Sequence, residues 1–216
     1  MDTRTPKKQW TLAMRANHWL MVVTILVLTI TGFYIADPFS VSSGETIDKF
    51  VMGWMRYFHL MAGFVLTFAF FWRIYLAFFS RFHADWKDFF AWTDFHNLLT
   101  QLKFYTFISR KKPEHIRLYG PLQSIAYSVL IFLLLVMVVT GLILSGAEYH
   151  AGVTSWTYAA VGPVENLLGG LAVTRFIHHA FTWLVILFAV VHVYMAFWYD
   201  VVFREGTVSS MIGGHV

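Results

Sequence analysis

The stretch TRFIHHAFTWLVILFAVVHVYMAFWY, at positions 174–199, decides the fold. It is apolar enough and long enough for a helix to cross a bilayer, whose hydrocarbon core is about 30 Å thick. Its residues His178 and His192 lie 14 positions apart, which places them within about 40° of one helical face and roughly 21 Å apart along the axis. A histidine inside a membrane span is costly and indicates a functional site. The stretch therefore predicts a transmembrane helix with one imidazole near each membrane edge.

Composition points the same way for the whole chain. The 216 residues are 58% hydrophobic and only 13% charged, whereas a soluble domain carries about twice that charged fraction. The sequence therefore indicates an integral membrane protein. It has no cysteine, which excludes disulfides, iron–sulfur clusters, zinc–thiolate sites and covalent c-type haem attachment within this chain. The net charge of +4 does not fall on a soluble basic domain, so no nucleic-acid partner is predicted.

Four apolar stretches predict an all-α membrane protein, a four-transmembrane-helix bundle in a single domain over residues 1–216. The polar segment 80–120 mixes aromatic, leucine and basic residues and predicts one or two amphipathic helices on the membrane surface. Residues 147–174, rich in glycine and containing Pro163, are predicted to be a loop, and residues 200–216 a short tail. The four spans are expected at about 17–36, 54–79, 121–146 and 174–199.

The distribution of Lys and Arg predicts the orientation. With four spans both termini lie on one side of the membrane, and the basic residues of cytoplasmic loops exceed those outside. The terminal segments and the segment 73–117 hold 13 of the 16 basic residues, and the opposite side holds Lys49, Arg56 and Arg175. We therefore expect both termini and the amphipathic segment in the cytoplasm of a bacterium, with the protein in its inner membrane.

The orientation sorts four histidines into two levels. His59 and His178 begin spans that start outside, whereas His18 and His192 lie at the inner membrane edge. Two axial nitrogens at each of two depths, in apolar and aromatic surroundings, are what bis-histidine ligation of two stacked b-type haems requires. The alternative for each histidine alone is an interfacial or hydrogen-bonded residue. The agreement in depth, two by two, favours a di-haem electron-transfer site.

Other residues fit these levels, each with a structural alternative. Arg73 lies 14 positions after His59, where it could pair with haem propionates or simply mark the inner boundary. Gly32 shares the face of His18 at the outer level, where it could admit a porphyrin or pack against another helix. Gly141 is expected to allow close helix packing. His179 is rotated about 140° from the His192 face, so His178 is the preferred ligand.

At these residues the chain resembles the b-type cytochrome subunit of membrane-bound nickel–iron hydrogenases, which is related to the di-haem gamma subunit of formate dehydrogenase. The resemblance covers nearly the whole chain. The matching motifs are RANHWLM (15–21), YFHLMAGF (57–64), YGPLQSIAY (119–127), RFIHHAFTWL (175–184), VVHVYMAFWYD (190–200) and REGTVSSMIGG (204–214).

The resemblance implies a direction for the electrons. A periplasmic hydrogenase, with its nickel–iron large subunit and iron–sulfur small subunit, would oxidise hydrogen, and this chain would not activate hydrogen itself. His59 and His178 would ligate the haem nearer the hydrogenase, and His18 and His192 the haem nearer the quinone, which is menaquinone or ubiquinone. The quinone pocket would lie near Tyr119, Gly120 and Gln123. Relatives often carry asparagine at the position of Gly120.

Two rival functions stay open from the sequence. One is the same electron-transfer role for formate dehydrogenase or another periplasmic oxidoreductase. The other is a four-span transporter or scaffold without haem, in which the histidines act as proton relays.

Overall fold

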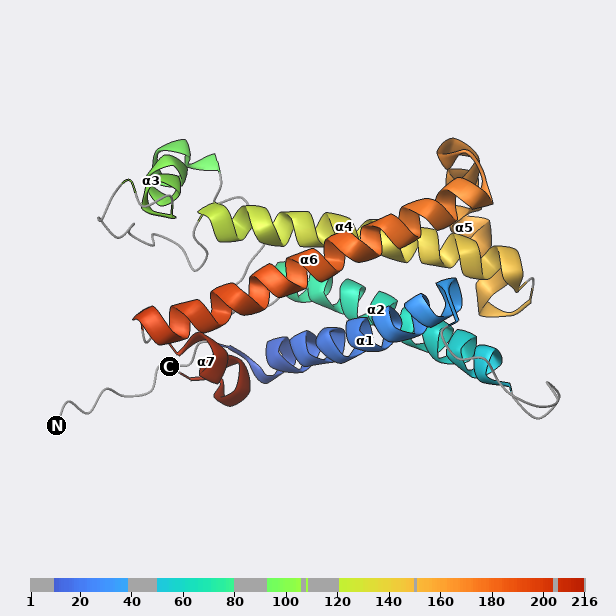
Figure 1. The fold of residues 1–216 in the computed structure, drawn as a ribbon, viewed down its shortest axis with the longest axis horizontal. Coiled ribbons are helices and arrows are strands. Elements are labelled where there is room, and N and C mark those ends of the chain that lie inside the picture. Colours follow the sequence, from blue (N-terminus) through green and yellow to red (C-terminus); the bar gives the residue numbers. More distant parts are fainter. Residues whose placement is uncertain are drawn as a thin grey trace. The chain divides into compact units, whose positions relative to one another are not determined.

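The computed structural model describes residues 10–38, 50–79, 93–105, 108, 121–149, 151–203 and 206–215. All seven regular elements in these ranges are α-helices. Four are long: α1 (Leu12–Ala36), α2 (Val51–Phe79), α4 (Pro121–Glu148) and α6 (Leu171–Phe203). Three are shorter: α3 (Phe95–Tyr105), α5 (Val153–Leu168) and α7 (Thr207–Gly213) (Figure 1).

The four long helices confirm the predicted number of membrane spans. Each is long and apolar enough to cross a bilayer, since even 25 residues rise about 38 Å along a helix axis. Large apolar side chains such as Leu26, Phe68 and Leu187 are exposed on these helices. Such exposure is what lipid contact requires and what a soluble protein avoids. The observed helices begin up to five residues before the predicted spans, and differences of this size at helix ends are common.

The chain divides into two compact units, which we describe separately. The first, called the His59 unit, comprises Ala16–Trp72 and Leu135–Ile186. The second, called the tail unit, comprises Met1–Arg15, Arg73–Leu134 and Leu187–Val216.

In the His59 unit, parts of all four long helices pack on one another. The buried Asn17 side chain donates through Nδ2 to the Ala69 carbonyl at 2.8 Å, which ties α1 to α2. The rings of Phe33 and Trp183 meet at a steep angle with centroids 5.0 Å apart, which joins α1 to α6. The core here includes the fully buried Ile143 of α4. Four helices thus surround a shared interior within this unit.

The prediction of a loop over residues 147–174 is wrong, because α5 occupies most of it. Glycine permits its two boundaries: Gly152 precedes the helix at φ 66°, and Gly169 ends it in the left-handed conformation at φ 98°. Pro163, one of the residues that favoured a loop, lies within the helix. Glycine also lets α5 fold back on α4, since a Cβ at Gly146 would lie 2.3 Å from the Cβ of Tyr158 (Figure 1).

In the tail unit, the predicted tail contains the helix α7, which lies beside the start of α1 (Figure 1). The indole of Trp10 donates to the Ser210 hydroxyl at 3.2 Å, and its backbone N–H donates to the Gly214 carbonyl at 3.3 Å. Arg15 donates through its guanidinium to the Ile212 carbonyl. Residues 10–15 are therefore hydrogen-bonded to residues 210–214.

The predicted amphipathic segment 80–120 is described only in part. Residues 93–105 and 108 are described, and they include α3. The buried Gln101 of α3 accepts a hydrogen bond through Oε1 from the backbone N–H of Leu122 at 3.1 Å. This contact satisfies one of the N–H groups that the first turn of α4 leaves without a helical partner. Residues 80–92, 106–107 and 109–120 lie outside the described residues.

Candidate cofactor site

His59 of α2 and His178 of α6 meet inside the His59 unit. Their ring centroids lie 6.4 Å apart and the ring planes are inclined by 70°. Both side chains are partly buried. The structure thus brings together the two histidines that were predicted at the outer level.

The separation of the two rings fits a metal ion between them. A metal–imidazole nitrogen bond is about 2 Å long, so two nitrogens on opposite sides lie about 4 Å apart, with each ring centre about 1 Å further out. The observed 6.4 Å between centroids agrees with this sum. No group of three or more His, Cys, Asp or Glu side chains gathers around a common point among the described residues. A haem iron needs two protein ligands of this kind, because its macrocycle supplies the others.

A threonine hydroxyl contacts the Nδ1 nitrogen of each imidazole. Thr31 Oγ1 of α1 lies 2.9 Å from His59 Nδ1, and Thr140 Oγ1 of α4 lies 2.8 Å from His178 Nδ1. Both threonines are buried. The sequence analysis missed them, although the dipeptide Thr-Gly recurs at 31–32 and 140–141 and could have drawn attention to both.

The glycine of each Thr-Gly dipeptide makes room for the same ring. A Cβ at Gly32 would lie 3.1 Å from His59 Cε1, and a Cβ at Gly141 would lie 3.3 Å from His178 Cε1. These distances are shorter than ordinary carbon contacts. Gly32 therefore admits the imidazole that faces it, and the close packing expected of Gly141 is packing against a histidine ring.

His179 has different surroundings from its neighbour. Its side chain is exposed, and its ring meets the edge of Phe33 with centroids 5.7 Å apart. The helical angle used to separate the two histidines agrees with these positions, since His178 is the one that faces His59.

The inner histidines fall in different units. His192 belongs to the tail unit, where its ring stacks on Phe188 with centroids 5.7 Å apart and meets the edge of Tyr127 at 6.4 Å. His18 belongs to the His59 unit, where its ring meets the edge of Trp19. The pairing of His18 with His192 stays a prediction.

Arg73 lies in the tail unit, as does His192. It is partly buried and interacts electrostatically with Tyr127, the residue whose ring contacts His192. Arg73 and His192 thus share Tyr127 as a neighbour, and the role of Arg73 beside the inner haem stays a prediction. Of the quinone-site candidates, Gln123 lies in the first turn of α4, and Tyr119 and Gly120 lie outside the described residues.

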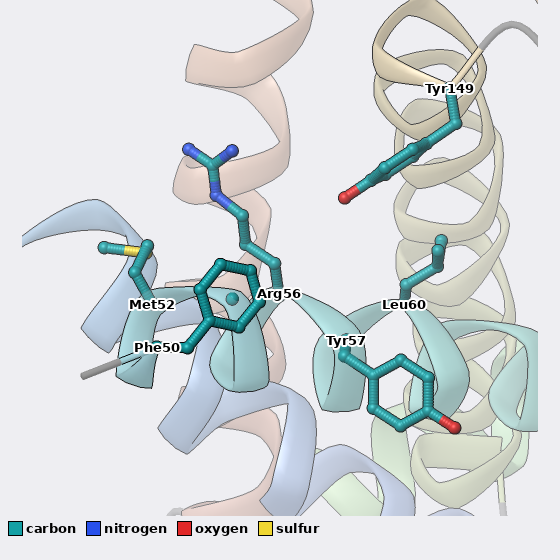
Figure 2. Close-up of a pocket in the computed structure, with 7 residues that line it drawn as sticks. Phe50, Met52, Arg56, Tyr57, Leu60 and Tyr149 are labelled. Atoms are coloured by element: carbon teal, nitrogen blue, oxygen red, sulfur yellow. The ribbon is translucent and has the colours of Figure 1, made fainter. Parts of the chain in front are cut away.

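A pocket of about 420 Å³ lies elsewhere in the His59 unit, at the start of α2. Figure 2 shows the Arg56 and Leu60 side chains rising from α2 on the side where Tyr149 lies. Arg56 is already paired, because its guanidinium donates to Glu148 Oε1 at 2.8 Å. The pocket is lined by Phe50, Met52, Gly53, Arg56, Tyr57, Leu60 and Tyr149, and it does not contain the facing histidines.

Comparisons with known proteins cover almost the whole chain. A family model described as prokaryotic cytochrome b561 matches residues 9–214. A probable Ni/Fe-hydrogenase B-type cytochrome subunit of Rhodobacter capsulatus is 36% identical, over 94% of this chain and 78% of that protein. A protein of the same name from Azotobacter vinelandii is 32% identical over 93% of this chain and 84% of its own. The probable Ni/Fe-hydrogenase 1 B-type cytochrome subunit of Escherichia coli K12 is 27% identical, over 94% and 87%.

Proposed function

Because the chain belongs to the prokaryotic cytochrome b561 family, we propose that it is a membrane electron-transfer subunit that holds two b-type haems. His59 and His178 would ligate the outer haem, and His18 and His192 the inner one. The observation that carries the proposal is the facing of His59 and His178 across the interior of the His59 unit, with their ring centroids 6.4 Å apart.

The residues of the chain have distinct roles in this proposal. The four histidines would supply nitrogen ligands to the two irons from helices, which would limit rearrangement when the oxidation state changes. Arg73 neutralises propionate charge at the inner level. Gly32 leaves room for the imidazole of His59. Bound haem supplies an iron centre that accepts and releases one electron at a time.

The orientation gives the electron path a direction. We infer that both termini and the segment with α3 are cytoplasmic, because 13 of 16 basic residues fall on that side. The outer pair then faces the periplasm and the inner pair faces the cytoplasm of a bacterial inner membrane. The apolar side chains exposed on the four spans contact lipid.

The names of the relatives support a partner. Proteins 27–36% identical to this chain are named as subunits of Ni/Fe-hydrogenases. We propose that this chain takes electrons from the iron–sulfur small subunit of a periplasmic nickel–iron hydrogenase, whose large subunit oxidises hydrogen. It would deliver them to menaquinone or ubiquinone near Tyr119, Gly120 and Gln123.

Formate dehydrogenase is the alternative partner, and co-purification separates the two. A tagged chain isolated from native membranes should bring down a nickel-containing large subunit. Recovery of a molybdenum or tungsten formate dehydrogenase in its place would favour the alternative.

A haem-free transporter or scaffold is the alternative of another class. The facing histidines and the family favour a haem-binding function. A reduced-minus-oxidised spectrum of the purified chain tests whether haem is bound. Absence of a b-type α-band would refute the electron-transfer function.

The assignment of the inner level is tested by His192→Ala. This variant should perturb the inner haem, block quinone reduction and leave the outer haem in place. Loss of the outer haem alone would contradict the proposed pairing. His179→Ala serves as the control, because His179 lies on the same helix and contacts Phe33.

A further inference from the structure

Two helices that supply neither facing histidine each present a Thr-Gly dipeptide to one of them. Thr31 and Gly32 of α1 contact His59, and Thr140 and Gly141 of α4 contact His178. In both cases the threonine meets Nδ1 and the glycine faces Cε1, the adjacent atom of the ring. The same arrangement therefore occurs twice, once on each side of the histidine pair.

The hydroxyl proton of each threonine is already committed to its own helix. Thr31 Oγ1 lies 2.7 Å from the Val27 carbonyl oxygen, and Thr140 Oγ1 lies 2.6 Å from the Val136 carbonyl oxygen. A carbonyl oxygen only accepts hydrogen bonds, and a hydroxyl has a single proton. In both contacts the threonine must therefore be the donor to the carbonyl.

The remaining contact of each hydroxyl is then fixed in direction. Because its proton points at the carbonyl, Thr31 Oγ1 faces His59 Nδ1 with a lone pair, so Nδ1–H is the donor. The same holds for Thr140 and His178. In a neutral imidazole with a proton on Nδ1, the lone pair available to a metal is on Nε2.

We propose that Thr31 and Thr140 are positioning residues that hold His59 and His178 in the Nδ1–H tautomer and fix the ring angle, so that each Nε2 presents its lone pair to the iron of the outer haem. This inference rests on the proposed function, because it takes the two histidines as haem ligands. It adds a role for the third span, α4, whose sequence offers no strong metal ligand of its own.

A neutral acceptor suits this depth in the membrane. A carboxylate beside Nδ1 would place a charge in the apolar interior, which is costly. A threonine that is already bonded to its helix adds an acceptor without adding a charge. Its hydrogen bond orients the ligand and raises the electron density on the metal-binding nitrogen.

Other threonines of the spans also donate a hydrogen bond to a carbonyl of their own helix, so this bond alone does not set Thr31 and Thr140 apart. Thr24 donates to the Leu20 carbonyl at 2.6 Å, and Thr67 donates to the Gly63 carbonyl at 2.8 Å. Hydroxyls in apolar helices commonly bond in this way. Unlike Thr24 and Thr67, Thr31 and Thr140 also contact an imidazole nitrogen.

The test compares Thr31→Val and Thr140→Val with Thr31→Ser and Thr140→Ser. Valine keeps the shape and removes the threonine acceptor, whereas serine keeps the hydroxyl. The backbone of Leu28, which is also hydrogen-bonded to His59, stays in place in the Thr31 variants. The buried Thr24 on the same helix as Thr31 provides the control Thr24→Val. The measurements are a redox titration of the b-type α-band and low-temperature electron paramagnetic resonance of the ferric haems, both made on the intact complex in membranes.

The valine variants should raise the midpoint potential of one and the same haem and change its resonance, because a less electron-rich ligand stabilises ferric iron less. The serine variants and Thr24→Val should match the unaltered chain. Loss of the outer haem from the valine variants, with retention in the serine variants, would also support the proposal.

Three outcomes would overturn the inference: unchanged potentials and resonances in both valine variants, equal effects of serine and valine, or perturbation of a different haem by each valine variant. The proposed function fails separately, if the unaltered chain itself lacks two b-type haems.

Discussion

The imidazole of His59 on α2 faces that of His178 on α6 with their ring centroids 6.4 Å apart. Within the His59 unit each ring also contacts a neighbouring helix. His59 contacts Thr31 of α1, and His178 contacts Thr140 of α4. Four helices therefore contribute to one pair of side chains. This arrangement gives a role to the Thr-Gly dipeptides at 31–32 in α1 and 140–141 in α4, each of which contacts one of the two rings.

Replacing either facing histidine should remove the same haem. His59→Ala and His178→Ala should each lower the haem content by roughly half, because an iron with one protein ligand is held weakly. His179→Ala should keep the full content, since that side chain is exposed and contacts Phe33. Haem extraction with spectroscopy of the remaining haem checks this. Removal of different haems by the two variants would refute the pairing.

Alanine at either glycine beside the rings should crowd the site. Gly32→Ala and Gly141→Ala place a Cβ 3.1 Å and 3.3 Å from an imidazole carbon, and overpacking of this kind costs typically 1–3 kcal/mol. Gly213→Ala is the control, because Gly213 lies on α7 in the tail unit, where a Cβ would meet nothing within 4 Å. The control should be neutral or more stable by up to about 1 kcal/mol. Thermal unfolding in detergent measures both, and equal effects at all three glycines would contradict the packing described.

The hydrogen bond between α1 and α2 should contribute modestly to stability. Asn17→Ala removes the donor to the Ala69 carbonyl, and interhelical bonds in membrane proteins average about 0.6 kcal/mol, with a maximum near 1.7. Thr67→Val removes a hydrogen bond within one helix and is the comparison. We expect the midpoint of thermal unfolding to fall more for Asn17→Ala. The reverse order would show that the bond does not join the helices in the native protein.

Alkaline pH should weaken α5. The Tyr158 hydroxyl donates to Glu165 Oε2 at 2.7 Å, and this hydrogen bond, together with the charge of Glu165, raises the pKa of Tyr158 above its usual value. The contact thus stabilises the fold below the ordinary pKa of tyrosine and is lost as pH rises through the raised pKa. Unfolding measured from about pH 9 upward should therefore depend less on pH in Tyr158→Phe than in the unaltered chain. Identical profiles would show that the contact has no effect.

The sequence predicted the spans well because membrane insertion depends on length and apolarity, which each stretch carries by itself. The facing of His59 and His178 was also inferable, since helical spacing and the charge distribution assign depth. Their contacts with Thr31 and Thr140 depend on how neighbouring helices are rotated, and a single sequence does not encode that in any local pattern. A Thr-Gly dipeptide in an apolar helix reads equally well as small-residue packing.

The missed helix α5 has a different cause. Gly152 and Gly169 are ordinary signs of irregular structure, and here they mark the two ends of a helix. Pro163 strengthened the misreading, because proline usually ends helices. Pro163 nevertheless lies inside α5, and α5 packs on α4 where Tyr158 approaches Gly146.

The most direct test of the account is the haem content of the purified chain, determined together with a redox titration of its b-type absorbance. The account predicts close to two haem b per chain and a titration with two components, one of which disappears in both His59→Ala and His178→Ala. A chain that binds no haem, or a single haem unaffected by replacing His59 and His178, would contradict it.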